Sequence, residues 1–399
     1  MSRGKNVLAV SYMGTKRHLA PVVADLVDDS QSGPLLDLFS GMCSVGQAVA
    51  PARQVWSNDL QRFAYLVATC QFCGRSDAPD RKWAEDQLVT HYSLHKQRLA
   101  TALSREIDVE LEALSEQSIE RLSKLFEDGI FQANRISHGE GSRHQLFIDR
   151  YSGTYFGISQ SVEIDAIRYA IDHLDGECAE KDWLLVALCS AMARCANTTG
   201  HFAQALNPKQ SNIGKVLGQR MRSVWDEFLS AFDRLEAIGE PDWRAGNRAF
   251  QTEAASLLAE LIPHAEVGVV YADPPYTADQ YSRYYHLYET AILYDYPAAR
   301  GRGLYRDNRP VSQFSHASKV RASIEQLIAR TSRLKADLIL SYPADGLLPS
   351  SRSQIGEMIK EHFGRPPEVF PIFHNHSTMG ASKGDAKRQV TELLYRARS

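Results

Sequence analysis

This chain of 399 residues has no long apolar run, no two CxxC motifs and no large excess of positive or negative charge. No stretch approaches 18 consecutive apolar residues, so the sequence predicts no transmembrane helix. The six cysteines are scattered, which is typical of a reducing cytoplasm rather than of a disulfide-bonded secreted domain. The first residues also lack the apolar stretch and cleavage site of a secretory signal. We therefore expect a cytoplasmic protein that does not contact a membrane.

Several fingerprints of metal and nucleotide chemistry are missing as well. Cys70 and Cys73 form a lone CxxC without a second pair, and the thirteen histidines include no HxxxH with an attendant acid, so we expect no metal site. The GxGxxG of dinucleotide oxidoreductases and the GxxxxGK[ST] of ATPases do not occur. The net charge of −3 excludes a globally basic nucleic-acid binder but is compatible with a local basic face.

The most informative segment that is present spans residues 267–276, Val-Gly-Val-Val-Tyr-Ala-Asp-Pro-Pro-Tyr. Its β-branched run predicts a buried strand of a parallel sheet, and the prolines end that strand because neither can donate to a ladder. Open α/β sheets bind their ligands at this end of the strands. Asp273 offers a carboxylate, Pro274 a carbonyl and Tyr276 a ring. This set suits a planar base, whose amino hydrogens the two acceptors would bind while the ring stacks on its face.

The N-terminal region predicts the opening β-α-β of a nucleotide-binding sheet. Residues 16–29 have helical spacing, and 35–39 form a short apolar run that leads into the small-residue loop 40–46. Residues 55–59 predict a second strand that ends in an acid. Gly41 would let the backbone approach a ligand, and an acid at the second strand end suits the hydroxyls of an adenosine ribose, although a plain strand-to-helix turn has the same pattern.

The middle of the chain changes from β-α alternation to helical periodicity. Helices are expected at 83–130, 163–175, 182–197 and 214–238, with a turn-rich loop at 134–161. Strands are expected again at 267–272 and 337–341, followed by a closing pair at 369–373 and 390–395. We therefore expect an α/β core with a mixed sheet, formed by residues 1–70 and 241–399, and split by a mostly helical insertion, 71–240.

Four segments, read together, carry a family resemblance. Residues 12–16 (Tyr-Met-Gly-Thr-Lys), 37–41 (Asp-Leu-Phe-Ser-Gly), Asp59 and 273–276 (Asp-Pro-Pro-Tyr) resemble the Dam-like, alpha-class group of DNA adenine-N6 methyltransferases. Their order is that of the group: a lysine-bearing segment, a cofactor loop, a recognition insertion, and then the Asp-Pro-Pro-Tyr turn. The resemblance covers residues 11–60 and 245–395, with Cys43 standing where the group often has glycine.

The resemblance implies a Rossmann-like methyltransferase core that uses S-adenosylmethionine. Tyr12 and Lys16 would border the methionine end of the cofactor, and Asp59 would hold its ribose. On residues alone, Lys16 could equally be a solvated charge at a helix start. The cofactor-binding residues implied are Tyr12, Lys16, Asp37, Phe39, Ser40, Gly41, Asp59 and Asp273. The catalytic residues implied are Asp273, Pro274, Pro275 and Tyr276.

The implied activity is methyl transfer to the exocyclic amino group of adenine in double-stranded DNA, with the adenine flipped out of the duplex onto Tyr276. Alignment and electrostatics would supply the acceleration, without a metal or a covalent enzyme intermediate. The insertion would read the target sequence, and the arginines of residues 300–309 would grip the backbone. We expect a monomer. The resemblance also allows a cognate restriction endonuclease as a partner.

Other functions stay open at the level of sequence. An adenine methyltransferase acting on RNA would use the same turn. An amino-cytosine methyltransferase fits less well, because that group more often carries serine in place of Asp273. A catalytically silent S-adenosylmethionine- or DNA-binding module is disfavoured by the intact tetrad, and a nicotinamide oxidoreductase by the missing glycine fingerprint.

Overall fold

The computed structural model describes residues 18–74, 76–141, 144–175, 180–262, 264, 266–376 and 388–399. These residues form two compact units. The helical unit comprises the described parts of Ser76–Glu236 and Arg283–Arg309. The sheet unit comprises the described parts of Gly14–Arg75, Ala237–Ser282 and Pro310–Ser399. The segment Arg283–Arg309 therefore groups with the helices, whereas the sequence-based division placed it with the α/β core.

Seven strands within the described residues form one sheet, and its parallel and antiparallel pairs confirm the predicted mixed sheet. Their bounds are β1 Leu35–Asp37, β2 Val55–Asn58, β3 Arg248–Phe250, β4 Val269–Ala272, β7 Asp337–Pro343, β8 Glu368–His376 and β9 Arg388–Ala397. The order across the sheet is β3-β2-β1-β4-β7-β9-β8. The first five strands of this order run parallel, and β9 is antiparallel to both β7 and β8. Strand β3 has no counterpart among the predicted strands.

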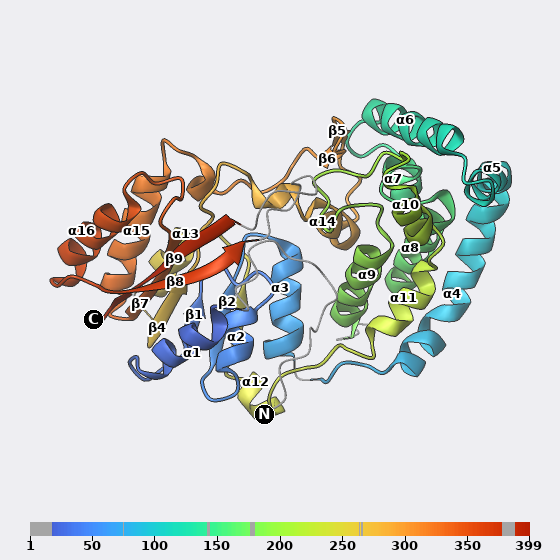
Figure 1. The fold of residues 1–399 in the computed structure, drawn as a ribbon. Helices are drawn as coiled ribbons and strands as arrows, with labels where there is room; N and C mark the ends of the chain where they lie inside the picture. Colours follow the sequence, from blue (N-terminus) through green and yellow to red (C-terminus); the bar gives the residue numbers. More distant parts are fainter. Residues whose placement is uncertain are drawn as a thin grey trace. The chain divides into compact units, whose positions relative to one another are not determined.

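Helices cover both faces of the sheet (Figure 1). One face carries α1 Ala20–Asp28, α2 Ser44–Val49 and α3 Arg62–Ala68, which continues as the π-helical turn η1 Thr69–Cys73. The other face carries α13 Ala254–Leu261, α15 Val320–Arg333 and α16 Ser351–Phe363, whose apolar side chains form one core with those of β4 and β7. Every residue of β4 is buried, as expected for a parallel strand covered on both sides. The short helix α12, Pro241–Arg244, precedes β3.

The helical unit contains nine helices among its described residues. They are α4 Arg81–Ala102, α5 Ser104–Ser115, α6 Ile119–Arg135, α7 Leu146–Tyr151, α8 Ile158–Asp172, α9 Lys181–Cys195, α10 Ile213–Arg220, α11 Val224–Ala231 and α14 His286–Leu293. A short hairpin, β5 Ala299–Arg300 and β6 Tyr305–Arg306, belongs to the same unit. The predicted helix 83–130 is three helices, and α7 lies inside the predicted loop 134–161, so that part of the loop prediction was wrong.

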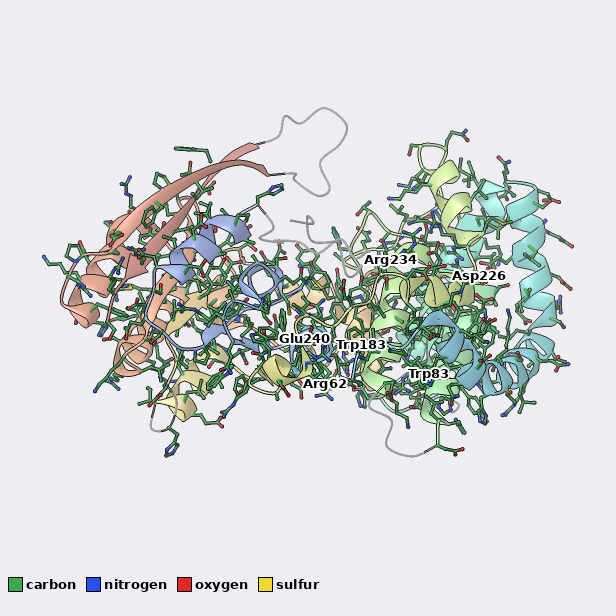
Figure 2. The ribbon with its side chains drawn as sticks, turned by 90° about the horizontal axis from the view of Figure 1, so that it is seen from below. Arg62, Trp83, Trp183, Asp226, Arg234 and Glu240 are labelled. Carbon is green, nitrogen blue, oxygen red and sulfur yellow. The ribbon has the colours of Figure 1, made fainter. Side chains whose placement is uncertain are left out.

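Helices α8 and α9 form the centre of the helical unit. Nearly all of α8 is buried, including charged side chains, and Trp183 in the first turn of α9 is among the largest fully buried residues (Figure 2). The buried carboxylate of Asp165 explains why the short α7 forms. It accepts hydrogen bonds from the backbone N–H groups of Phe147 and Ile148, each at 3.0 Å, at the otherwise unsatisfied start of α7.

Candidate active site

The loop that follows β1 is bound to both neighbouring strands. The backbone N–H of Leu38 donates to the carbonyl of Tyr271 at the end of β4, at 3.0 Å. On the other side, the N–H of Ser40 donates to the carbonyl of Asn58 at 2.9 Å. The loop is therefore held at the point where β1 meets β2 on one side and β4 on the other, the switch point at which open α/β sheets bind ligands.

Left-handed backbone conformations give this loop its shape. Gly41 has a φ of +48°, and Cys43 has a φ of 60° at the residue that caps α2. Cys43 thus adopts the conformation that glycine takes most readily, at a cost of about 1–2 kcal/mol for a residue with a Cβ. Its N–H donates to the carbonyl of Ser40 at 2.7 Å. The turn into α2 therefore forms without glycine at this position, and burial raises the pKa of the Cys43 thiol well above its usual value.

Asp59, which follows β2, is held in place by backbone amides. Its Oδ2 accepts from the N–H of Gly41 at 3.0 Å, and its Oδ1 accepts from the N–H of Gln61 at 2.9 Å. Burial raises the pKa of Asp59, and these amide hydrogen bonds oppose that rise. Each carboxylate oxygen has a second lone pair, so the side chain can still accept hydrogen bonds from ligand hydroxyls.

Asp37 is the most deeply buried acid of the site. It lies at the end of β1 with 1% of its surface exposed. Burial raises its pKa to about 8, with the nearby charges of Asp273 and Asp59 adding to the rise and a hydrogen bond from the Phe39 backbone opposing it. Its Oδ1 has no hydrogen-bond partner within the described residues. The Asp37 carboxyl therefore keeps its proton to higher pH than an exposed aspartate does.

The Asp-Pro-Pro-Tyr turn follows β4, directly beside the loop after β1. The two strands pair in parallel with Asp37 opposite Tyr271, so Asp273 comes two residues beyond this pair. Pro274 is buried, and Asp273 and Tyr276 are half-buried. The ring of Tyr276 packs against the core on the α13–α15 face, and its carbonyl accepts from the N–H of Leu347 at 2.8 Å. The turn is thus fixed on the sheet by the backbone as well as by its prolines.

Sequence reasoning missed Asn58, the buried last residue of β2. Its Nδ2 donates to the carbonyls of Leu38, at 3.0 Å, and Thr252, at 3.2 Å, and its Oδ1 accepts from the N–H of Thr252 at 3.3 Å. One amide therefore ties together the carboxyl ends of β1, β2 and β3. The available signal was a polar residue inside a predicted buried strand, just before the acid at the strand end.

A second missed feature is the 3-10 turn η3, Gln313–Ser315. The Phe314 ring meets the Phe39 ring edge-to-face, with centroids 5.3 Å apart. Beside it, the Ser315 hydroxyl donates to the carbonyl of Asp279 at 3.1 Å, and the N–H of Ser312 donates to Oε1 of Gln280 at 2.9 Å. This turn therefore braces both the loop after β1 and the chain that leaves the Asp-Pro-Pro-Tyr turn.

Most of the predicted site residues thus lie in the sheet unit, at the carboxyl ends of three neighbouring strands, β2, β1 and β4. They are Asp37, Phe39, Ser40, Gly41 and Asp59 around the first loop, and Asp273, Pro274, Pro275 and Tyr276 in the second turn. Tyr12 and Lys16 fall outside the described residues.

Comparison with known proteins assigns this architecture to a family. The family model for D12 class N6 adenine-specific DNA methyltransferases matches residues 12–342. The chain belongs to this family. The match confirms the resemblance drawn from the four motifs and includes all of them.

Curated relatives of this D12-class chain are modification enzymes. It is 24% identical over 393 residues to the type II methyltransferase M.FokI of Planomicrobium okeanokoites, covering 96% of the chain and 51% of the relative. It is 24% identical over 396 residues to the modification methylase LlaI of Lactococcus lactis subsp. lactis, covering 96% and 54%. To M.NlaIII of Neisseria lactamica it is 29% identical over 236 residues, covering 57% and 59%. The chain spans about half the length of the relatives that it matches.

The arginines of residues 300–309 differ in their surroundings. Arg306 is 2% exposed and forms an ion pair with Asp295 at 2.6 Å, so it is a buried structural residue of the D12-class chain. Arg302 pairs with Glu127 at 2.8 Å, and the Arg300 side chain donates to the carbonyl of Asn134 at 3.1 Å. The side chains of Arg300 and Arg302 are exposed. No helix among the described residues is long and apolar enough to cross a membrane.

Proposed function

We propose that this chain binds S-adenosylmethionine on the loop after β1 and transfers its methyl group to the exocyclic amino group of adenine in double-stranded DNA. The observation that carries the proposal is the place of the Asp-Pro-Pro-Tyr turn, beside that loop at the switch point of a parallel sheet. Membership of the D12 class supports the choice of adenine and of DNA.

The residues around the loop fit the proposed cofactor. Two buried acceptors, Oδ1 of Asp37 and Oγ of Ser40, have no hydrogen-bond partner within the described residues, as expected where a ligand supplies the donors. Asp59 would accept from the ribose hydroxyls and Phe39 would border the adenine moiety, with Gly41 leaving room for close approach. Tyr12 and Lys16 complete the proposed set. The bound cofactor supplies an electrophilic methyl group on a positively charged sulfur.

The chemical task of the turn is to prepare a poor nucleophile. The lone pair of an adenine amino group is delocalised into the ring, which makes the nitrogen weakly nucleophilic. Asp273 and the Pro274 carbonyl would each accept one amino hydrogen, which favours a pyramidal nitrogen whose lone pair can attack the methyl carbon. Pro275 keeps the turn rigid and Tyr276 would stack on the flipped base. The cofactor would supply the methyl group and keep the electron pair of its methyl–sulfur bond on sulfur, and the methylated amino group would release its extra proton to solvent.

Substitution of Asp273 tests this assignment. We expect Asp273→Ala to lower methyl transfer from labelled cofactor to duplex DNA by at least roughly 10²–10³-fold, the size of effect seen when one preorganised transition-state contact is removed. Calorimetric binding of S-adenosylmethionine should persist in the variant, because Asp59 and the loop are intact. Asp25→Asn, an exposed acid on α1 of the same unit, is the matched control and should retain activity.

Parallel reactions with duplex DNA and with RNA of the same sequence separate the proposed substrate from its nearest rival. Activity on RNA alone would assign the chain to RNA adenine methylation. Undiminished transfer by Asp273→Ala would refute the assignment of the site. Absence of transfer by the unmodified chain, with cofactor bound, would favour a silent binding module.

We further propose that the sheet unit catalyses methyl transfer and that the helical unit recognises the target DNA sequence. Exposed Arg300 and Arg302 are the proposed backbone contacts, since arginines on a surface can neutralise phosphates. The proposed enzyme acts as a monomer in the cytoplasm, and a cognate restriction endonuclease is its proposed partner, in keeping with the modification methylases among its relatives. Sedimentation at assay concentrations tests the monomer.

A further inference from the structure

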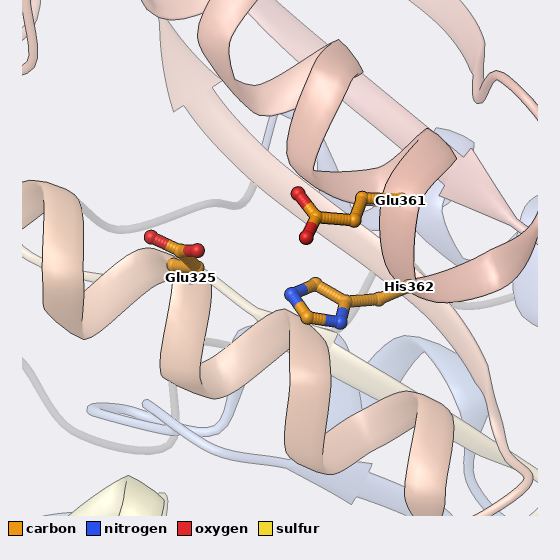
Figure 3. Close-up of side chains that lie close together, drawn as sticks. All are labelled: Glu325, Glu361 and His362. Carbon is orange, nitrogen blue, oxygen red and sulfur yellow. The ribbon is translucent and has the colours of Figure 1, made fainter.

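A cluster of metal-ligating side chains lies between two helices of the sheet unit. Glu325 extends from α15, and Glu361 and His362 extend from the last turn of α16 (Figure 3). One ligand atom from each residue lies within 4.8 Å of those from the other two. None of the three belongs to the loop after β1 or to the Asp-Pro-Pro-Tyr turn.

The imidazole of His362 supplies an independent indication of a ligand. Its Nε2 is buried and has no hydrogen-bond partner within the described residues. Figure 3 shows a ring nitrogen of His362 directed toward the carboxylates of Glu325 and Glu361. A buried ring nitrogen normally has a partner, because burial removes the water that would otherwise bind it. Here a cation between the three side chains would satisfy it.

The surroundings permit both entry and binding. An open cavity of about 560 Å³ borders Glu325 and His362 and extends to Gln313, so an ion can reach the cluster from solvent. The backbone carbonyl of His362 accepts from the Ser332 hydroxyl at 2.7 Å, which fixes the end of α16 against α15. Glu325 also pairs with Arg321 at 3.3 Å, but both side chains are exposed, and such pairs are weak competitors for a carboxylate.

We propose that Glu325, Glu361 and His362 bind a divalent transition-metal cation of the zinc type. Imidazole nitrogen together with carboxylate oxygen is a ligand set that zinc accepts, and three protein ligands leave one position for water. Bonds of about 2.0–2.2 Å in a tetrahedral site place ligand atoms roughly 3.4 Å apart. The ligand atoms, which lie within 4.8 Å of one another, must therefore approach by up to about 1.4 Å, which rotation of the two glutamates can supply.

The bound cation would join α15 to α16 and so stabilise the sheet unit, because a ligand that binds only the folded state raises stability by mass action. This inference does not rest on the proposed methyl transfer. The cation would touch no residue of the proposed active site, so its removal should leave that site chemically intact.

Titration of the untagged full chain with Zn²⁺, followed by calorimetry, tests the site. We expect one strong site in the unmodified chain and at least roughly tenfold weaker binding by His362→Ala, since even loss of a residue that supports a ligand costs roughly 10–100-fold. Glu361→Gln should also weaken binding. The matched control is Glu357→Gln, an exposed glutamate one turn earlier on α16, which should bind as the unmodified chain does.

Co²⁺ in place of Zn²⁺ identifies the ligands by its absorption spectrum. The proposed site has no sulfur ligand, so the near-ultraviolet bands of cobalt–thiolate bonding should be absent. Thermal unfolding without metal should show that His362→Ala is folded. No strong binding by the unmodified chain, equal binding by His362→Ala and the unmodified chain, or thiolate bands at the tight site would each overturn the proposal.

Discussion

Glu110 of the helical unit and the two site acids of the sheet unit, Asp37 and Asp59, are buried with opposite kinds of partner. In the helical unit, Glu110 forms a 2.6 Å ion pair with Arg220, and both side chains are 3% exposed. In the sheet unit, Asp37 and Asp59 form no ion pair with any described residue and are bound by backbone N–H groups. A buried acid with a counter-charge is explained by the fold, whereas one without it holds a position at some cost, which is typical of functional sites. Asp165 of the helical unit also lacks an ion pair with any described residue, but its two hydrogen bonds to the start of α7 give it a structural role.

The same substitution, carboxylate to amide, should therefore have opposite effects in the two units. Glu110→Gln leaves the Arg220 guanidinium buried without its counter-charge, so we expect a loss of about 3–5 kcal/mol in the free energy of unfolding. Urea denaturation followed by circular dichroism measures this loss. A change below about 1 kcal/mol would mean that the Glu110–Arg220 pair does not stabilise these helices. The contrast between Glu110 and the site acids would then be contradicted.

Asp37→Asn should stabilise the sheet unit at and above neutral pH. The folded-state pKa of about 8 lies above the unfolded value, so the folded state binds the proton more tightly. The contribution of Asp37 is fully present below about pH 4 and is lost as pH rises to about 8, with a slope of at most about 1.4 kcal/mol per pH unit. Asparagine removes this slope. Guanidinium denaturation at pH 5, 7 and 9, without cofactor, measures the free energy of unfolding of both forms. The advantage of Asp37→Asn over the unmodified chain should grow as the pH rises. A difference that does not change with pH would contradict the pKa shift.

Asn58→Ala tests the amide that ties three strand ends together. Its removal leaves the carbonyl of Leu38 and the N–H and carbonyl of Thr252 without these hydrogen bonds, so we expect a loss of about 1–3 kcal/mol in the free energy of unfolding. Binding of S-adenosylmethionine should weaken in parallel, because the loop after β1 loses an anchor. Gln47→Ala is the matched control, because the Gln47 amide donates to Oε1 of Gln71 on η1, at 2.9 Å, away from the strand ends. Loss of stability with unchanged cofactor affinity would separate Asn58 from the site.

Arg121→Ala should give the smallest loss in the free energy of unfolding among these substitutions. Arg121 pairs with Glu112 and Glu116 at 2.8 and 2.9 Å, but these side chains are exposed. We expect at most a small loss of stability, which high salt should reduce further because solvent screens such pairs. Thermal unfolding at low and high ionic strength checks this. An effect as large as that of Glu110→Gln would show that burial is not what distinguishes the two kinds of ion pair.

The sequence pattern was sufficient to predict those parts of the fold in which the burial of a segment is visible in the residue types of that segment alone. The apolar run before Asp273, the β-α-β opening around Gly41 and the closing antiparallel pair are strands or turns whose burial shows in adjacent residues. The mixed sheet follows from them. Strand β3, with only three residues that are half-buried or exposed, carries no such pattern and forms because β2 offers it a parallel edge.

Features that depend on distant partners left no usable signal. Arg306 looks like a surface arginine in a glycine-rich loop until Asp295 is seen to pair with it. The turn η3 reaches the proposed site only because Phe314 meets Phe39, which lies 275 residues earlier. The proposed metal ligands Glu325 and His362 come from two helices, so their spacing in the sequence matches no metal-binding motif. In each case the decisive contact joins residues that are separated in the chain, so the local sequence around either residue does not reveal its partner.

The position of β9 bears on the order in which the protein can be built. This strand lies between β7 and β8, and the sheet unit is assembled from three separate stretches of chain. Helices α4 to α11, in contrast, come from one uninterrupted stretch. During synthesis those helices can pack while the ribosome is still translating the later strands. The sheet can be completed only after residues 388–397 have emerged, so the edge of β7 must wait unpaired until nearly all of this sequence is outside the exit tunnel.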